Sequence, residues 1–141
     1  MDGSAPAPYD AGRMEPPLFD FWEKVHAICE RDTRFRREAY EFVMRALEHT
    51  TARVVGPRRH VSGQELLAGV VELARQEFGD LAWTVFREWG VTRSEDFGAI
   101  VFALVGDGLL GRQPEDSIQD FSGGIDLKHE LEPPKSPHQR P

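Results

Sequence analysis

The most restrictive feature of the sequence is an uncharged apolar stretch, FGAIVFALV, at residues 97–105. It follows Ser94, whose hydroxyl can cap a helix, and Glu95 and Asp96, whose carboxylates are favourable at the positive end of a helix dipole. The apolar side chains wrap most of the circumference of a helix, so they cannot all face one neighbour. We therefore expect a central, buried helix around which the rest of the chain packs.

Four more segments place apolar residues at three- and four-residue spacings, which is typical of amphipathic helices. Asp20 is a suitable N-cap for the first, and Ser62 with Glu65 has the spacing of a capping box at the start of the third. Gly79 and Gly90 should end the third and the fourth, because glycine readily adopts the left-handed closing conformation. The five predicted helices span residues 20–31, 36–52, 62–79, 80–90 and 94–108.

The region after the fifth helix is expected to hold turns and a short strand. Pro114 should start a turn or short helix that runs to Phe121, and residues 125–127 could pair with residues 109–112. A helix, a turn, a second helix and a glycine-punctuated hairpin look like a winged helix-turn-helix. The predicted fold is therefore mostly α: a compact five-helix domain, winged-helix-like, with a short β-hairpin near its C-terminal end.

The chain of 141 residues has the size of one domain. Residues 1–17 are rich in Pro, Ala, Gly and Asp, and residues 128–141 are polar and contain four prolines. Neither segment can offset its ordering entropy by burying apolar surface. We expect disordered tails at 1–17 and 128–141 and a single helical domain at 18–127.

Cysteine content and hydropathy indicate the compartment. Cys29 is the only cysteine, so no disulfide can form within the chain, and its apolar neighbours suggest a buried thiol in a reducing compartment. No apolar run reaches the roughly 20 residues that span a bilayer, and the first residues lack the basic and apolar regions of a secretion signal. A cytoplasmic location without membrane contact is expected.

The charge is unevenly distributed along the chain. The net charge is -7, which argues against a general nucleic-acid binder, because such proteins usually carry an excess of Lys and Arg. Residues 31–60 nevertheless hold eight arginines and four acids, whereas residues 94–132 hold nine acids and two cations. Such polarity can steer a partner, although a small domain often has asymmetric charge without a role.

Residues that could carry out catalysis or hold a metal lack the necessary surroundings. Cys29 lies in the last turn of its predicted helix, where the dipole disfavours a thiolate. His26 and Cys29 form the only close pair of metal-ligand types, and Glu95 with Asp96 is better explained as helix capping than as acid/base machinery. We predict no catalytic residue, no metal site and no cofactor, and hence no enzymatic activity.

Several short strings together resemble one protein family. They are RRHVSGQELL at 58–67, EFGDLA at 77–82, WGV at 89–91, EDFGAIVFALV at 95–105, GLL at 108–110 and EDSIQDF at 115–121. In order and spacing they look like the Minf-type family of small bacterial proteins of unknown function, over residues 20–127. The resemblance implies a bacterial origin and a helical domain, and it transfers no site residue.

The leading functional hypothesis is a non-enzymatic protein–protein interaction module. The candidate partner-binding residues are Arg58, Arg59, His60, Ile118 and Phe121, although the segment around the last two is also suited to covering the domain's own core. The alternative is a nucleic-acid- or ribosome-associated factor that uses the basic 31–60 region. Against it, the predicted helix at 94–108 contains three acids and no cation that could contact phosphate.

Overall fold

The computed structural model describes residues 18–52, 61–111, 121–123 and 125–133. Within these ranges the regular structure is entirely helical, and the prediction of a mostly α fold is confirmed. The elements in chain order are α1 (Leu18–Arg31), α2 (Arg37–Thr50), α3 (Gly63–Phe78), the short 3-10 helix η3 (Gly79–Leu81), α4 (Ala82–Trp89), α5 (Ser94–Gly106) and α6 (Leu127–Leu131).

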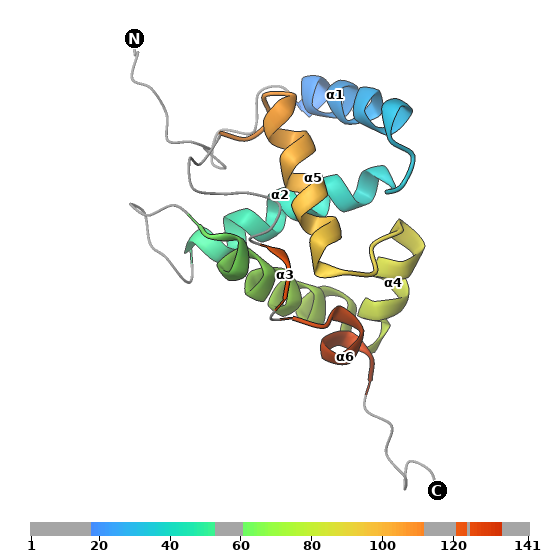
Figure 1. The fold of residues 1–141 in the computed structure, drawn as a ribbon, viewed down its shortest axis with the longest axis vertical. Helices are drawn as coiled ribbons and strands as arrows, with labels where there is room; N and C mark the ends of the chain where they lie inside the picture. The colour runs from blue at the N-terminus through green and yellow to red at the C-terminus, as the bar shows by residue number, and fades with distance from the viewer. Residues whose placement is uncertain (1–17, 53–60, 112–120, 124, 134–141) are drawn as a thin grey trace, which may run out of the picture.

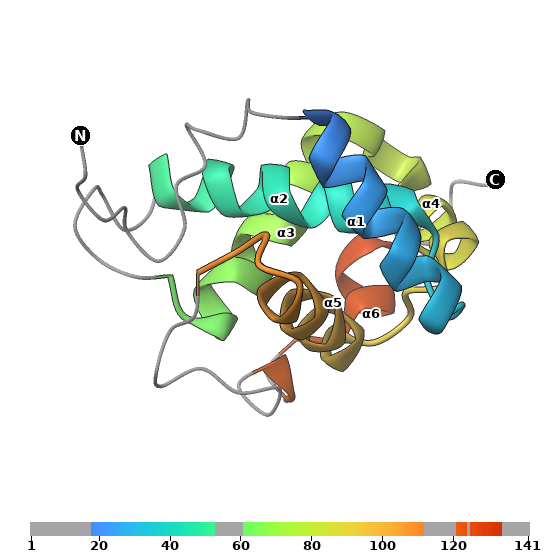
Figure 2. The same cartoon turned by 90° about the horizontal axis from the view of Figure 1, so that it is seen from above.

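The central helix of the fold is α2. It packs most extensively against α3 and also contacts α1, α4 and α5 (Figures 1 and 2). The sequence predicts one apolar face for this segment, and the structure buries a wider sector, because Tyr40, Met44 and Thr50 are also inside. A helix with neighbours on several sides has to bury more than one stripe.

The helix predicted to be central, α5, is buried on only one side. Phe97, Ile100 and Leu104 are fully buried, whereas Phe102 is 65% exposed. The prediction of burial all round is therefore wrong for Phe102. The high apolar content of α5 did not distinguish the side that packs on α2 and α3 from the side that faces outward.

An aromatic cluster joins four of the helices. Phe42 of α2 lies between Phe78, Phe86 and Trp89, with ring centroids 5.4 to 5.9 Å apart. Phe86 also meets Phe97 of α5 edge to face at 5.4 Å. These separations are typical of favourable aromatic pairs, so the cluster fixes α3, α4 and α5 around α2.

The predicted start of α3 and the predicted ends of α3 and α4 agree with the structure. Ser62 Oγ accepts a hydrogen bond from the Glu65 amide at 3.1 Å, and Glu65 Oε1 accepts one from the Ser62 amide at 3.0 Å, which is a complete capping box. Gly79 and Gly90 follow α3 and α4 with φ angles of +54° and +89°.

Two other predicted helix starts differ from the structure. α1 begins at Leu18, so Asp20 lies in its first turn and is not its N-cap. The residue before α5 is Arg93, and Ser94 is the first helical residue. Asp96 Oδ2 accepts hydrogen bonds from the amides of Thr92 and Arg93 at 2.9 and 3.0 Å. These amides precede the helix, whereas a Ser94 hydroxyl at the N-cap would have accepted from the amide of Asp96 or Phe97.

The end of the described chain corrects the expected hairpin and tail. Leu127, which was expected in a strand, is the first residue of α6, and its helix is capped by the Asp126 side chain. In the described parts of 109–112 and 125–127 there is no strand. α6 packs on α3 and α4 and buries Leu127 and Leu131, so residues on both sides of position 127 contribute to the core. Two leucines four residues apart supply the apolar contact that the polar composition concealed.

Candidate functional site

The five residues predicted to bind a partner are mostly outside the described part of the chain. Arg58, Arg59, His60 and Ile118 lie there, and the structure does not place them. Phe121 is described and is only 3% exposed, as part of the hydrophobic core. Its ring therefore packs on the domain itself, which is one of the two alternatives that the sequence left open.

The outward side of α5 is an apolar surface. Phe102 is 65% exposed, and the residues at neighbouring helical positions have small side chains. At Gly106 an added Cβ would meet no other atom within 4 Å, so the surface is open there. We call Ala99, Phe102, Ala103 and Gly106 the α5 face. No charged side chain occurs in α5 after Asp96, and the next one along the chain is Asp107.

Two other large apolar side chains are exposed among the described residues, and each has a charged residue beside it. Leu81 is 64% exposed and directly follows Asp80 in η3. Trp22 is 37% exposed, and its ring contacts Phe21 edge to face at 5.0 Å. The guanidinium of Arg37 lies over the Trp22 ring, 5.8 Å from its centroid. Phe102 is thus the exposed aromatic that lies on an uncharged helix face.

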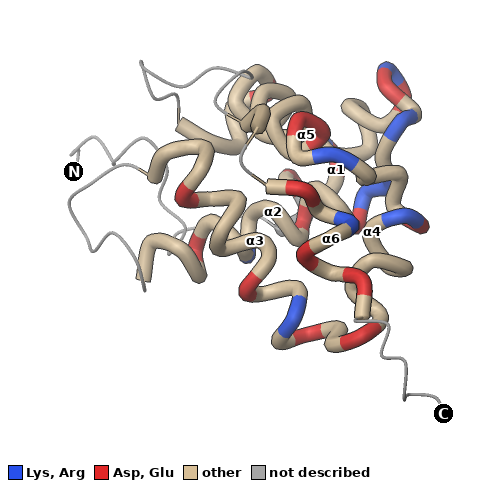
Figure 3. Tube along the Cα trace, turned by 60° about the horizontal axis from the view of Figure 1, so that its bottom comes forward, with Lys and Arg blue, Asp and Glu red and all other residues tan. Residues whose placement is uncertain are grey.

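The arginines at the α1–α2 turn fall into two groups. Arg31 pairs with Asp107 at 2.9 Å, and Arg34 makes hydrogen bonds of 2.7 to 3.2 Å to both carboxylate oxygens of Asp32. Arg36 and Arg37 are exposed and have no ion pair with any residue that the structure describes. Figure 3 shows positive residues concentrated toward the side that carries α4 and the start of α5, and acidic residues along α3 and α6.

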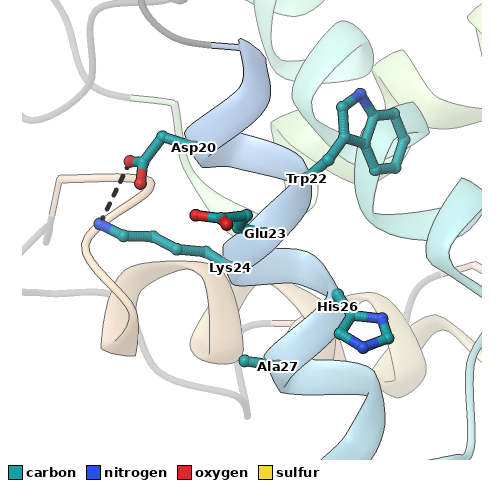
Figure 4. A pocket seen from close by; sticks show the side chains of 6 residues that line it. All are labelled: Asp20, Trp22, Glu23, Lys24, His26 and Ala27. Carbon is teal, nitrogen blue, oxygen red and sulfur yellow. Dashed lines mark ion pairs between the residues drawn. The ribbon is translucent and has the colours of Figure 1, made fainter.

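A shallow depression runs along α1, and it has no catalytic arrangement. All the described residues that line it come from this one helix, and Figure 4 shows their side chains spread around it. The one ion pair among them joins Lys24 Nζ to Asp20 at 3.7 Å. Side chains that diverge from a single helix do not converge on one point, so the described lining shows no cluster of groups that could act on the same atom.

The half-buried thiol of Cys29 is held in its protonated form. Burial, followed by the charges of Asp32 and Glu38, raises the pKa of Cys29. The thiol lies 3.8 Å from the Phe35 carbonyl oxygen, to which it can donate a weak hydrogen bond. A thiol whose pKa is raised is a poor nucleophile and a poor metal ligand.

The described histidines on α1 and α2 contact carboxylates. His26 lies 3.2 Å from Glu30, and His49 lies 3.0 Å from Glu72 across the α2–α3 contact. His26 and Cys29 therefore have different neighbours, although they are one turn apart. The described residues contain no group of three or more His, Cys, Asp or Glu side chains that could hold a metal ion.

Comparison of the chain with family models, with curated proteins and with solved structures gives no match. None of the described helices is both long enough and apolar enough to cross a bilayer. The features that remain for a functional argument are the α5 face and the arginines without an acidic partner. Arg36 and Arg37 belong to the basic region predicted from the sequence, whereas the exposure of Phe102 was not predicted. Phe102 lies roughly opposite Ile100 and Leu104 on the helix, but apolar residues on both sides give no signal for which side is exposed.

Proposed function

We propose that the chain is a non-enzymatic protein–protein interaction module that binds another protein through the α5 face. The observation that carries the proposal is the 65% exposure of Phe102 on a stretch of α5, residues 97–106, that contains no charged residue. The partner is a protein whose contact surface offers an apolar pocket for this ring.

The energetics of an exposed aromatic ring support such a contact. Full burial of a phenylalanine side chain is worth about 1.5 to 3 kcal/mol, and buried aromatic anchors dominate the binding energy of many interfaces. Ala99, Ala103 and Gly106 surround the ring with small side chains, which let a partner backbone or side chain approach the helix closely. An uncharged surface also spares the partner the cost of desolvating ions.

Leu81 provides a matched control, because its exposure of 64% is nearly that of Phe102. A photo-crosslinking amino acid would be placed at 102 or at 81, and crosslinked proteins from the cells that encode this chain would be identified. The partner would then be purified, and its affinity measured for Phe102→Ser and Leu81→Ser. We expect Phe102→Ser to weaken binding by at least about tenfold, as loss of an interface anchor does, and Leu81→Ser to leave it unchanged.

Three results would contradict the proposal. Equal crosslinking from both positions would mean that the α5 face is not selective. An unchanged affinity in Phe102→Ser would remove the ring from the interface. Sedimentation as a dimer that Phe102→Ser converts to a monomer would show that the occupant is a second copy of this chain.

A second candidate function is that of a nucleic-acid- or ribosome-associated factor. The observation that favours it is that Arg36 and Arg37 have no ion pair with a residue in the described ranges. In a winged-helix-like arrangement α5 would be the reading helix, and it carries no Lys or Arg. Contact with phosphates would then fall to the basic 31–60 region. On this reading Arg58→Ala with Arg59→Ala should lower affinity and reduce its dependence on salt, and an unchanged affinity would argue against it.

A further inference from the structure

Arg36 and Arg37 differ from the other described arginines of residues 18–52 in having no carboxylate partner. Each of the other arginines is in an ion pair: Arg31 with Asp107, Arg34 with Asp32, and Arg45 with Glu41 and Glu77. The two exceptions are adjacent in sequence, and both are exposed. Both guanidinium groups are therefore able to take external acceptors.

Contacts with other helices hold the backbone of Arg36 and the side chain of Arg37. The Arg36 amide donates a hydrogen bond to the Trp89 carbonyl oxygen at 3.0 Å, which holds the start of α2 against the end of α4. The Arg37 guanidinium lies over the ring of Trp22 from α1. Stacking on an aromatic ring restricts a long side chain before any ligand arrives, so less entropy is lost when it binds.

We infer that Arg36 and Arg37, with the partly exposed ring of Trp22, bind an acidic segment of a partner protein. A guanidinium donates two parallel hydrogen bonds to a carboxylate, which is stronger and more directional than the contact of an ammonium group. Trp22 adds apolar surface beside these charges, which an aliphatic portion of the same segment covers. Arg36, Arg37 and Trp22 are called the arginine surface below.

The surrounding charge favours a short acidic peptide over a nucleic acid. α1, the turn after it and the start of α2 also carry five acids, Asp20, Glu23, Glu30, Asp32 and Glu38. A nucleic acid presents phosphates at regular short intervals and needs several cations to bind them. The same segments offer it five carboxylates as well. A peptide with few carboxylates can place them only where the guanidinium groups lie.

The inference goes beyond the proposed function by assigning partner chemistry to a second surface, and it rests on that function only in taking the partner to be a protein. The two ideas can fail separately. Phe102→Ser should leave the binding of an acidic peptide unchanged, and loss of the arginines should leave an apolar contact at α5 available.

The test uses the full chain and three fluorescein-labelled probes. They are a short peptide of alternating Glu and Asp, the same peptide with Gln and Asn, and single-stranded DNA of equal formal charge. Fluorescence anisotropy at low and moderate salt gives each affinity. The acidic peptide should bind, and the neutral peptide should not. The double variant Arg36→Ala with Arg37→Ala should bind the acidic peptide at least about tenfold more weakly. This is the effect expected from losing one hydrogen bond to a charged group.

Two control variants separate a specific contact from general charge. Lys128→Ala removes one exposed positive charge on α6, and it should change the affinity by less than about twofold, since distant exposed charges are screened. Arg37→Lys keeps the charge but loses the planar stacking on Trp22, and its affinity should lie between those of the wild type and Arg37→Ala. Circular dichroism confirms that each variant keeps its helical content.

Three outcomes would overturn the inference. The first is an acidic peptide that binds the arginine variants as tightly as the wild type. The second is an equal effect of Lys128→Ala and Arg36→Ala, which would show binding by net charge alone. The third is tighter binding of the DNA than of the acidic peptide, lost in the arginine variants, which would assign the surface to nucleic acid.

Discussion

Gly69 of α3 lies directly against Thr50, the last residue of α2. A Cβ atom at position 69 would be 1.7 Å from Thr50 Oγ1 and 3.0 Å from its Cβ. Thr50 is fully buried, and its hydroxyl donates a hydrogen bond of 2.7 Å to the Ala46 carbonyl oxygen. The two central helices therefore approach so closely that the position has no room for a side chain.

Gly69→Ala should destabilise the domain. Overpacking of a buried contact costs about 1 to 3 kcal/mol, and rotating Thr50 away would break its hydrogen bond. The free energy of unfolding from urea titration measures the loss. Gly106→Ala is the control, because a Cβ there meets nothing within 4 Å and should cause no loss. If the clash is the cause, adding Thr50→Ala to Gly69→Ala should recover part of the stability.

Gly90→Ala should be more damaging than Gly79→Ala. Both glycines have positive φ, and such sparsely populated backbone conformations cost a residue with a side chain about 1 to 3 kcal/mol. At Gly79 that is the whole penalty, since a Cβ meets nothing within 4 Å. At Gly90 the Cβ would also lie 2.2 Å from the Arg34 carbonyl oxygen, which is backbone and cannot rotate away. Equal urea midpoints for the two variants would contradict this contact.

These glycines show which parts of the fold could be predicted from sequence. The Ser62 capping box and the stops at Gly79 and Gly90 depend on residues within a few positions of each other, so the sequence contains the whole signal. At the start of α5 two residues are suited to accept hydrogen bonds from backbone amides, Ser94 and Asp96. The choice between them depends on the path of the preceding turn, which is set by contacts from elsewhere in the chain.

The candidate site was harder to predict because it depends on what the core leaves uncovered. Phe102 is as apolar as Phe97, and only the placement of α2 and α3 makes one exposed and the other buried. Arg36 and Arg37 were grouped with Arg31 and Arg34 as one basic region. Arg31 and Arg34 differ from them because each has a carboxylate partner. That carboxylate is 76 positions away in sequence for Arg31 and two positions away for Arg34.

Asp96→Ala should destabilise the domain more than Asp96→Asn. Both hydrogen bonds from the Thr92 and Arg93 amides go to the same oxygen, Oδ2, so the single carbonyl oxygen of asparagine can accept both. Alanine leaves both amides without this acceptor, and loss of a helix cap costs about 0.5 to 2 kcal/mol. Thermal unfolding compares the two variants. An equal loss for the two variants would show that the negative charge, which both remove, matters more than the hydrogen bonds.

Asp32 should contribute stability that depends on pH. Hydrogen bonds from the Arg34 guanidinium hold the pKa of Asp32 below its ordinary value of 3.8. Because the folded-state pKa is the lower one, the contribution is present above pH 3.8 and is lost as the pH falls through the folded-state pKa. Asp32→Asn should therefore be less stable than the wild type at neutral pH, and the difference should shrink in acid. A difference that is constant with pH would exclude this ion pair as its source.

The last prediction concerns α6, which follows the predicted domain boundary. A chain that ends at Asp126 should be less stable than one that ends at Pro133, because it lacks Leu127 and Leu131, which are 1% and 4% exposed. It also lacks Glu130, whose carbonyl oxygen accepts a hydrogen bond of 2.7 Å from Arg75 of α3. Each buried leucine contributes about 2 to 5 kcal/mol relative to alanine, so the shorter chain should lose several kcal/mol. Equal unfolding free energies would mean that α6 does not stabilise the core.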